Sequence, residues 1–312
     1  MGSGLTFPWP DDAPPGVRLA QWIDRWNHGG VQPYSLGTMG MAGDPLVRQL
    51  EITQRRLWVS DLPERFRKFR VIQLSDIHHG LFLPLESIQR VVDAINALQP
   101  DLIAITGDYV TYSRAYIEPV AYALGQLEAR HGVYAVLGNH DYRVDADAVA
   151  SALMRRGIDV LRNRSVRLGS ASEPLYVTGV DDWNYGADLE AALADVPEGA
   201  PTMLLAHNPR IIYQAAERHV NLVLAGHTHG GQVNLPVVGN IYARSRDQMR
   251  FREGWDCLGR TQIYVSRGIG TVVLPWRYRC PPEVSCLELN PDCRGYSREL
   301  TREDIDLPLR VV

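Results

Sequence analysis

The sequence predicts an α/β protein built on a largely buried sheet. Short runs of Leu, Ile and Val recur along the chain, and longer segments with the apolar spacing of helices separate them. Strands that alternate with helices are typical of parallel sheets whose faces are covered by those helices. With 312 residues and 45% hydrophobic side chains, the chain is large enough to bury a sizeable core as one unit.

The regular pattern begins near Leu50 and continues in order along the chain. The predicted strands cover residues 50–59, 71–75, 102–106, 134–137, 203–206 and 222–225. The predicted helices cover residues 85–98, 116–130 and 146–156. Residues 1–48 are rich in Pro and Gly and allow at most one short helix over 17–26, so we expect an arm over 1–48 and one folded domain over 49–312.

Composition excludes several classes of protein. The formal net charge is −4, with 32 basic and 36 acidic residues, so no nucleic acid partner is expected. No apolar run approaches the roughly 18 residues of a membrane span, and no signal core follows Met1, which predicts a cytoplasmic protein. An exported form stays open if a leader was trimmed. A zinc ribbon is excluded and a disulfide requires export, given the spacing of Cys257, Cys280, Cys286 and Cys293.

Acid, amide and imidazole side chains follow five of the predicted strands. Because ligands collect at the carboxyl ends of strands in α/β sheets, we expect these side chains to lie together. The chain has nine histidines, and six of them stand in these loops, whereas His28, His131 and His219 are assigned to structure. The residues after the strands are Asp76, His78 and His79, then Asp108, then Asn139, His140 and Asp141, then His207, and finally His227 and His229.

The residue types in these loops indicate a metal centre. Asp, Asn and neutral His suit Mn²⁺, Fe, Zn²⁺ or Mg²⁺ rather than thiophilic metals. Seven candidate ligands exceed the four that one tetrahedral ion uses, so two ions that share a carboxylate are the economical interpretation. The candidates are Asp76, His78, Asp108, Asn139, His207, His227 and His229. Such pairs lie about 3.5–4 Å apart and are typical of phosphatases and nucleases. We expect two divalent ions, with Mn²⁺ favoured.

In order and spacing, the motifs Asp76-x-His78, Gly107-Asp108, Gly138-Asn139-His140-Asp141, His207 and Gly226-His227-x-His229 resemble the five motifs of the calcineurin-like metallophosphoesterases. The resemblance spans about residues 71 to 290 and implies a four-layer αββα sandwich. It also implies that Asp108 bridges two ions. The ligands of the first would be Asp76, His78 and His229, and those of the second Asn139, His207 and His227.

The resemblance also implies a mechanism for hydrolysis. A hydroxide held by both ions would attack phosphorus, and His140 would protonate the leaving oxygen or stabilise its charge. Asp141 would accept a hydrogen bond from the other ring nitrogen of His140 and fix its tautomer. His79 would face the substrate phosphate or make a loop contact.

The substrate class rests on weaker signals. Residues 226–236 and 266–284 resemble a bacterial subgroup that includes phosphodiesterases and membrane-associated UDP-2,3-diacylglucosamine pyrophosphatases of lipid A synthesis. A lipid-linked diphosphate and peripheral contact with the inner membrane would fit two segments that combine apolar or aromatic residues with cations. The first is the stretch 65–70, which alternates cations with aromatic residues. The second is the apolar run that contains Leu81, Phe82, Leu83 and Leu85. Trp276 and Arg277 would add an interfacial aromatic side chain and a cation.

Two alternatives stay open beside the lipid-linked substrate. The same metal chemistry would serve a broad-specificity or cyclic-nucleotide phosphodiesterase. A non-catalytic metal-binding scaffold is the alternative outside enzymology. No feature of the sequence indicates the oligomeric state.

Overall fold

Two six-stranded sheets form the centre of the molecule. The structure is a computed structural model that describes residues 49–235, 239–240 and 250–292. The first sheet contains, in spatial order, β1 (Glu51–Val59), β14 (Glu283–Pro291), β2 (Phe69–Leu74), β3 (Leu102–Thr106), β4 (Val133–Val136) and β5 (Asp159–Val160). The second contains β12 (Gly254–Leu258), β13 (Thr261–Val265), β9 (Leu222–Ala225), β8 (Thr202–Leu205), β7 (Pro174–Gly179) and β6 (Arg164–Gly169).

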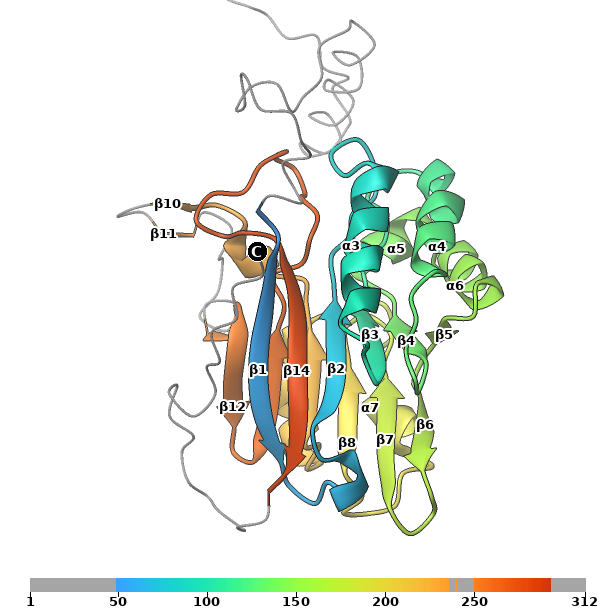
Figure 1. Cartoon of the computed structure of the whole chain (residues 1–312), viewed down its shortest axis with the longest axis vertical. Coiled ribbons are helices and arrows are strands. Elements are labelled where there is room, and N and C mark those ends of the chain that lie inside the picture. Colours follow the sequence, from blue (N-terminus) through green and yellow to red (C-terminus); the bar gives the residue numbers. More distant parts are fainter. Residues whose placement is uncertain (1–48, 236–238, 241–249, 293–312) are drawn as a thin grey trace, which may run out of the picture.

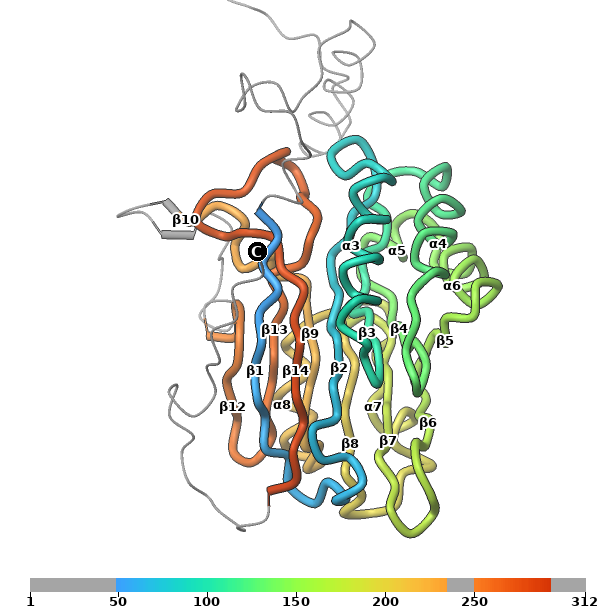
Figure 2. Tube along the Cα trace, viewed as in Figure 1, coloured from blue at the N-terminus to red at the C-terminus, as the bar shows by residue number. Residues whose placement is uncertain are grey.

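Parallel pairing dominates both sheets. In the first, β2, β3, β4 and β5 run parallel, while β14 is antiparallel to β2 and parallel to β1. In the second, β13, β9, β8 and β7 run parallel. Strands β1 and β14 lie side by side although they come from opposite ends of the described chain (Figures 1 and 2). The carboxyl ends of the parallel strands therefore gather at one edge of each sheet.

Helices cover the outer face of each sheet. The helices are α3 (Leu85–Ala97), α4 (Ile117–Leu124), α5 (Asn139–Val144), α6 (Ala146–Arg155), α7 (Leu189–Leu193) and α8 (Ile212–Glu217), and β10 (Asn234–Leu235) pairs with β11 (Gly239–Asn240). Helices α3, α4 and α6 pack on the first sheet and α7 and α8 on the second, each through its own apolar core. A third core, which includes Val71, Leu205 and Leu287, fills the space between the sheets. The expected four-layer αββα sandwich is confirmed.

The predicted helices are present, and one of them is shorter than expected. The helix predicted over 116–130 ends at Leu124, followed by Gly125. Beyond that point the side chain of Asn96, on α3, donates a hydrogen bond to the Gln126 carbonyl and accepts one from the Glu128 N–H. A tertiary contact thus satisfies backbone groups that a longer helix would have paired internally.

Some expectations lie outside the described residues. The arm over 1–48, including the helix over 17–26, and Cys293 belong to them. Cys280 and Cys286 are free thiols. Of the helices that the structure describes, none combines the length and the apolar character needed to cross a bilayer.

A buried carboxylate joins the two sheets near their shared edge. Glu283, the first residue of β14, accepts hydrogen bonds from the hydroxyls of Thr53 on β1 and Tyr264 on β13. Arg267 adds its backbone N–H at 3.0 Å and its Nε at 3.1 Å. Burial alone would raise the pKa of Glu283, but the Arg267 charge and these donors hold the pKa below its ordinary 4.5.

Replacing Glu283 by Gln should lower the free energy of unfolding at neutral pH by roughly 1–3 kcal/mol, because the charge-assisted hydrogen bonds are lost. The folded-state pKa lies below the unfolded value, so this stabilisation is present above about pH 4.5 and is lost as the pH falls through the folded pKa. Urea unfolding at several pH values should therefore show the two proteins converging in acid. The exposed Glu128→Gln variant serves as control, and a difference that stays constant with pH would contradict this account.

Candidate metal centre

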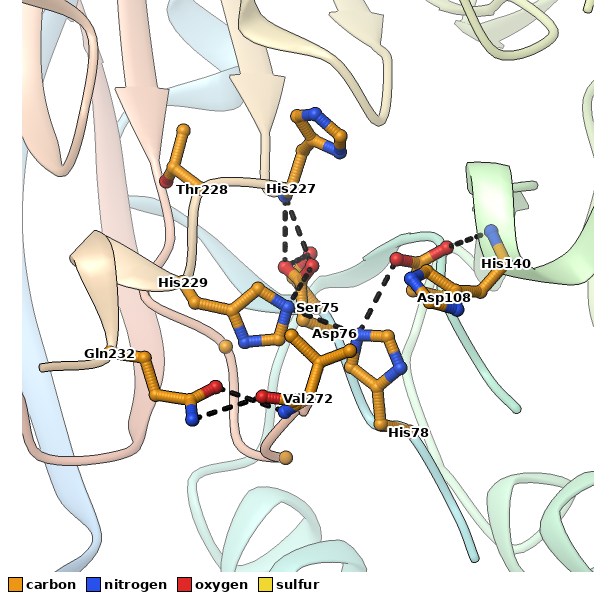
Figure 3. A network of polar contacts seen from close by, with 12 residues as sticks. Ser75, Asp76, His78, Asp108, His140, His227, Thr228, His229, Gln232 and Val272 are labelled. Carbon is orange, nitrogen blue, oxygen red and sulfur yellow. Dashed lines mark hydrogen bonds and ion pairs between the residues drawn. The ribbon is translucent and has the colours of Figure 1, made fainter. Parts of the chain in front are cut away.

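The polar residues that follow the predicted strands come together where the carboxyl ends of the two sheets meet. Asp76 and His78 follow β2, Asp108 follows β3, and Asn139 begins α5 directly after β4. From the second sheet, His207 follows β8, and His227 and His229 follow β9. Figure 3 shows Asp76, Asp108 and several of the histidine side chains close to one another.

One group of donor atoms involves Asp76, His78 and His229. The Nε2 atoms of His78 and His229 lie 3.0 Å apart, and His229 Nε2 is 3.3 Å from Asp76 Oδ1. Together with Asp108, these residues each offer one ligand atom within 4.8 Å of the others, and all four are buried. The structure thus brings together the three residues expected to hold a first ion.

A second group lies on the other side of Asp108. His207 Nε2 is 3.2 Å from His227 Nδ1. Asn139 is buried, and its Oδ1 has no hydrogen-bond partner among the described residues. An unsatisfied buried carbonyl oxygen is costly unless something else pairs with it, and a cation would do so.

Asp108 stands between the two groups. Its Oδ2 is 3.4 Å from His78 Nε2 and 3.2 Å from His207 Nε2, while its Oδ1 accepts a hydrogen bond from the His140 N–H. One carboxylate oxygen therefore faces a histidine of each group. This is the position that a bridging ligand requires.

Two threonines orient histidine rings of the site, and sequence reasoning missed both. The Thr106 carbonyl accepts from His207 Nδ1 at 2.7 Å, which leaves Nε2 free as a ligand. Thr111 Oγ1 lies 3.0 Å from His78 Nδ1 and orients the His78 ring through a hydrogen bond. Nothing in the sequence marks these residues, because their role depends on which rings the fold places beside them.

Burial sets the charge state of most of the imidazoles. It lowers the pKa of His78 and of His227 to about 3 and the pKa of His229 well below its ordinary value. These rings are neutral near pH 7, as metal ligands must be. His207 differs: burial lowers its pKa, but the nearby acids, Asp108 foremost, outweigh burial and raise it to about 10.

The acids experience the opposite effect of burial. Burial raises the pKa of Asp76 to about 6, and the neighbouring Asp108 charge adds to the rise. Divalent cations would offset the charge of both carboxylates and would replace the proton of His207. The donor set therefore fits a pair of divalent ions with oxygen and nitrogen ligands.

The backbone at the site is strained. Asp76, His78, Asp108, His227 and His229 have φ between 50° and 71°, in the left-handed region that is uncommon for residues other than glycine. The bordering glycines are required by space: a Cβ on Gly226 would lie 1.9 Å from the Ser75 hydroxyl oxygen and 2.4 Å from an Asp76 carboxylate oxygen. The loops are therefore specialised for aiming side chains rather than for local stability.

His140 lies beside this centre, but its expected partner is different. The His140 ring packs edge-on against His78, with centroids 4.9 Å apart, and its Nδ1 is 3.4 Å from the Thr111 carbonyl. Asp141 does not hold the His140 ring, so that expectation is wrong. The Asp141 carboxylate instead accepts from the backbone N–H groups of Gly138, Asp108 and Tyr109. Asp141 thus anchors the Asp108 loop.

Two residues expected at the substrate are buried in the protein. His79 is buried, its Nδ1 lies 2.9 Å from the Leu83 carbonyl, and its ring packs edge-on against Tyr116. The loop contact is therefore the correct alternative for His79. Phe82 is only 8% exposed and Leu83 is buried in the core under α3, whereas Leu81 and Leu85 are half-buried, so Phe82 and Leu83 do not form an open lipid-binding surface.

The other residues expected to contact the substrate differ in their exposure and in their contacts. Trp276 is 48% exposed, as an interfacial aromatic would be. The sequence predicts a substrate contact for Arg277, but its guanidinium donates to backbone carbonyls of the protein, including that of Gly270. Phe66 and Phe69 of the cation-aromatic stretch are buried. Phe66 precedes β2 and Phe69 is its first residue, so both lie at the opposite end of that strand from the centre.

Comparison with known proteins agrees with this geometry. The profile of the family described as "Calcineurin-like phosphoesterase" matches residues 69–231. An uncharacterized metallophosphoesterase of Bacillus subtilis, YkuE, is 34% identical over 246 residues, which are 77% of this chain and 85% of that protein. Phosphodiesterase YaeI of Escherichia coli is 31% identical over 225 residues, 71% of this chain and 82% of that protein.

Other relatives are longer than this chain. A protein of Danio rerio named "Transmembrane protein with metallophosphoesterase domain" is 31% identical over 267 residues, 81% of this chain but 59% of its own length. An uncharacterized metallophosphoesterase of Helicobacter pylori is 32% identical over 232 residues, 72% of this chain and 60% of that protein. The ordered motifs, the four-layer fold and the matched profile agree, and the chain belongs to the calcineurin-like phosphoesterase family.

Proposed function

We propose that this protein hydrolyses phosphodiester bonds with two divalent metal ions. Asp76, His78 and His229 hold one ion, Asn139, His207 and His227 hold the other, and Asp108 bridges them. The observation that carries the proposal is the place of Asp108 Oδ2, 3.4 Å from His78 Nε2 and 3.2 Å from His207 Nε2. A carboxylate oxygen between two histidine groups favours two ions over one.

The residues of the chain divide the chemistry between them. When bound, such an ion pair supplies Lewis acidity that offsets the negative charge of the phosphate group. His140 is the proton donor for the leaving oxygen in its doubly protonated form: Nδ1–H donates to the Thr111 carbonyl, which can only accept, and Nε2–H would give its proton to the leaving oxygen. Asp141 holds the Asp108 loop in place through its backbone hydrogen bonds.

The proposed substrate is a phosphodiester. The name of the Escherichia coli relative, a phosphodiesterase, supports this proposal. The finer proposal is a lipid-linked diphosphate such as UDP-2,3-diacylglucosamine, with Mn²⁺ as the ion. It rests on Trp276, whose ring is half exposed. The side chain of Gln232, which lies just after His229, donates hydrogen bonds to the backbone carbonyls of Val272, Leu274 and Trp276. These bonds hold the segment that carries Trp276. The acyl chains would contact Trp276 at the membrane surface.

Replacing Asp108 by Ala should abolish turnover of bis(p-nitrophenyl) phosphate and reduce the bound metal below two ions per chain. Without the shared carboxylate, two cations a few ångströms apart repel each other with no compensating charge. Metal analysis after dialysis measures the stoichiometry, and Asp93→Asn, on the exposed side of α3, is the control. Full metal content with normal turnover would disprove the two-ion arrangement.

His140→Ala should lower kcat by roughly 10²–10⁴-fold, the range for loss of a general acid, and should leave both ions bound. Substrates with good leaving groups need less proton transfer, so p-nitrophenyl esters should lose less than alkyl esters. The comparison of kcat for the two ester classes tests the role. An equal loss for both would assign His140 to phosphate binding, and full metal binding by wild type without any turnover would indicate a scaffold.

Trp276→Ala should raise KM for UDP-2,3-diacylglucosamine at least about tenfold and leave KM for bis(p-nitrophenyl) phosphate unchanged, because each acyl methylene that leaves the protein surface costs about 0.8 kcal/mol. Tyr122→Ala, at an exposed aromatic of α4, is the matched control. If wild-type protein hydrolyses a cyclic nucleotide faster than the lipid-linked substrate, the finer proposal is contradicted. The proposal that the protein is a phosphodiesterase would then remain.

A further inference from the structure

Arg277 is an unusual cation because the protein surrounds it with carbonyl groups instead of acids. Its Nε and Nη2 donate to the Gly270 carbonyl at 3.0 and 2.6 Å, and Nη2 also donates to the Arg267 carbonyl at 2.8 Å. Its Nη1 reaches the carbonyls of His229 and Cys280, both at 3.4 Å. Every hydrogen-bond partner of this guanidinium in the described part of the chain is a carbonyl oxygen or the Cys280 sulfur. It is therefore used as a multiple donor within the fold.

The carbonyls that Arg277 binds lie on the segments that carry ligands of the proposed first ion. The His229 carbonyl belongs to a ligand itself, and the Cys280 thiol donates to the same oxygen at 3.1 Å. Gly270 donates its own N–H to the Asp76 carbonyl at 2.8 Å, and Ile269 donates to the Ser75 carbonyl. One side chain thus connects the backbones of Asp76 and His229, which come from different sheets.

The contacts around Gly270 leave little room for this connection to move. A Cβ on Gly270 would lie 2.2 Å from the Ile77 carbonyl oxygen, so the two segments are in direct contact. The hydrogen bonds of Arg277 do not reach Asn139, His207 or His227 in the part of the chain described here. Its direct hydrogen bonds therefore serve the segments of the first group of ligands.

The geometry points to Arg277 as a positioning residue that sets the distance between Asp76 and His229 and so controls the affinity of the first metal site. This inference rests on the proposed two-ion function. Lysine cannot replace Arg277, because an ammonium group donates from one point, whereas the planar guanidinium serves carbonyls in several directions. The Arg277 side chain does not touch the substrate in this account.

The test compares Arg277→Lys and Arg277→Gln with Arg279→Gln by titrating Mn²⁺ into metal-free protein. Arg279 is exposed and packs over the Tyr278 ring, 5.8 Å from its centroid, so it is a matched control two residues away. We expect both Arg277 variants to bind one ion with wild-type affinity and the other roughly 10- to 100-fold more weakly, the usual cost of losing a residue that orients a ligand. Excess Mn²⁺ should restore kcat.

Three results would overturn this role for Arg277. Two ions bound with wild-type affinity would show that the connection does not matter, and equal weakening of both ions would show a general effect on the fold. Metal-free Arg277→Lys that is unfolded by circular dichroism would make Arg277 a stability residue. Fewer than two ions in wild-type protein would instead refute the proposed function, because that failure needs no Arg277 variant.

Discussion

The mutual approach of buried nitrogen and oxygen donors at the carboxyl ends of the two sheets is the constraint on which the rest of the site depends. His78 and His229 present their Nε2 atoms to each other at 3.0 Å, and Asp108 lies within 3.4 Å of His78 and His207. Burial keeps most of these rings neutral, so each of them retains a nitrogen lone pair that can bind a metal ion. Cations placed among these donors would make the arrangement favourable.

The fold provides this arrangement by using its second sheet as a counterpart of the first. Parallel strands of each sheet end at the same edge, so Asp76, His78 and Asp108 meet His207 and His229 at the end of the apolar layer between the sheets. Loops with left-handed backbone aim the side chains, and buried polar groups hold those loops. Asp141, Glu283 and Arg277 all act on backbone groups, which is the economical way to fix a loop whose side chains are committed to ligands.

The sequence predicts the parts of this structure that are local and leaves out those that depend on distant contacts. A ligand that directly follows an apolar strand is recognisable from its neighbours, as at Asp76 or His229. The role of Asp141 is not, because its partners include Asp108 and Tyr109, some thirty residues away. Strand β13 is not predicted from the sequence because it buries the polar side chain of Gln262. The Gln262 amide donates to the Trp58 carbonyl and accepts from the Trp255 indole N–H. The substrate contacts expected for Phe82 and Arg277 also depend on distant residues, because tertiary packing decides which side chains reach a substrate.

The central claim is that the centre holds two ions on either side of the Asp108 carboxylate, and anomalous X-ray diffraction from crystals grown with Mn²⁺ tests it most directly. The account predicts two anomalous peaks about 3.5–4 Å apart. One peak should lie among Asp76, His78 and His229, the other among Asn139, His207 and His227, with an Asp108 oxygen between them. A single peak, or two peaks without Asp108 as a shared ligand, would contradict it.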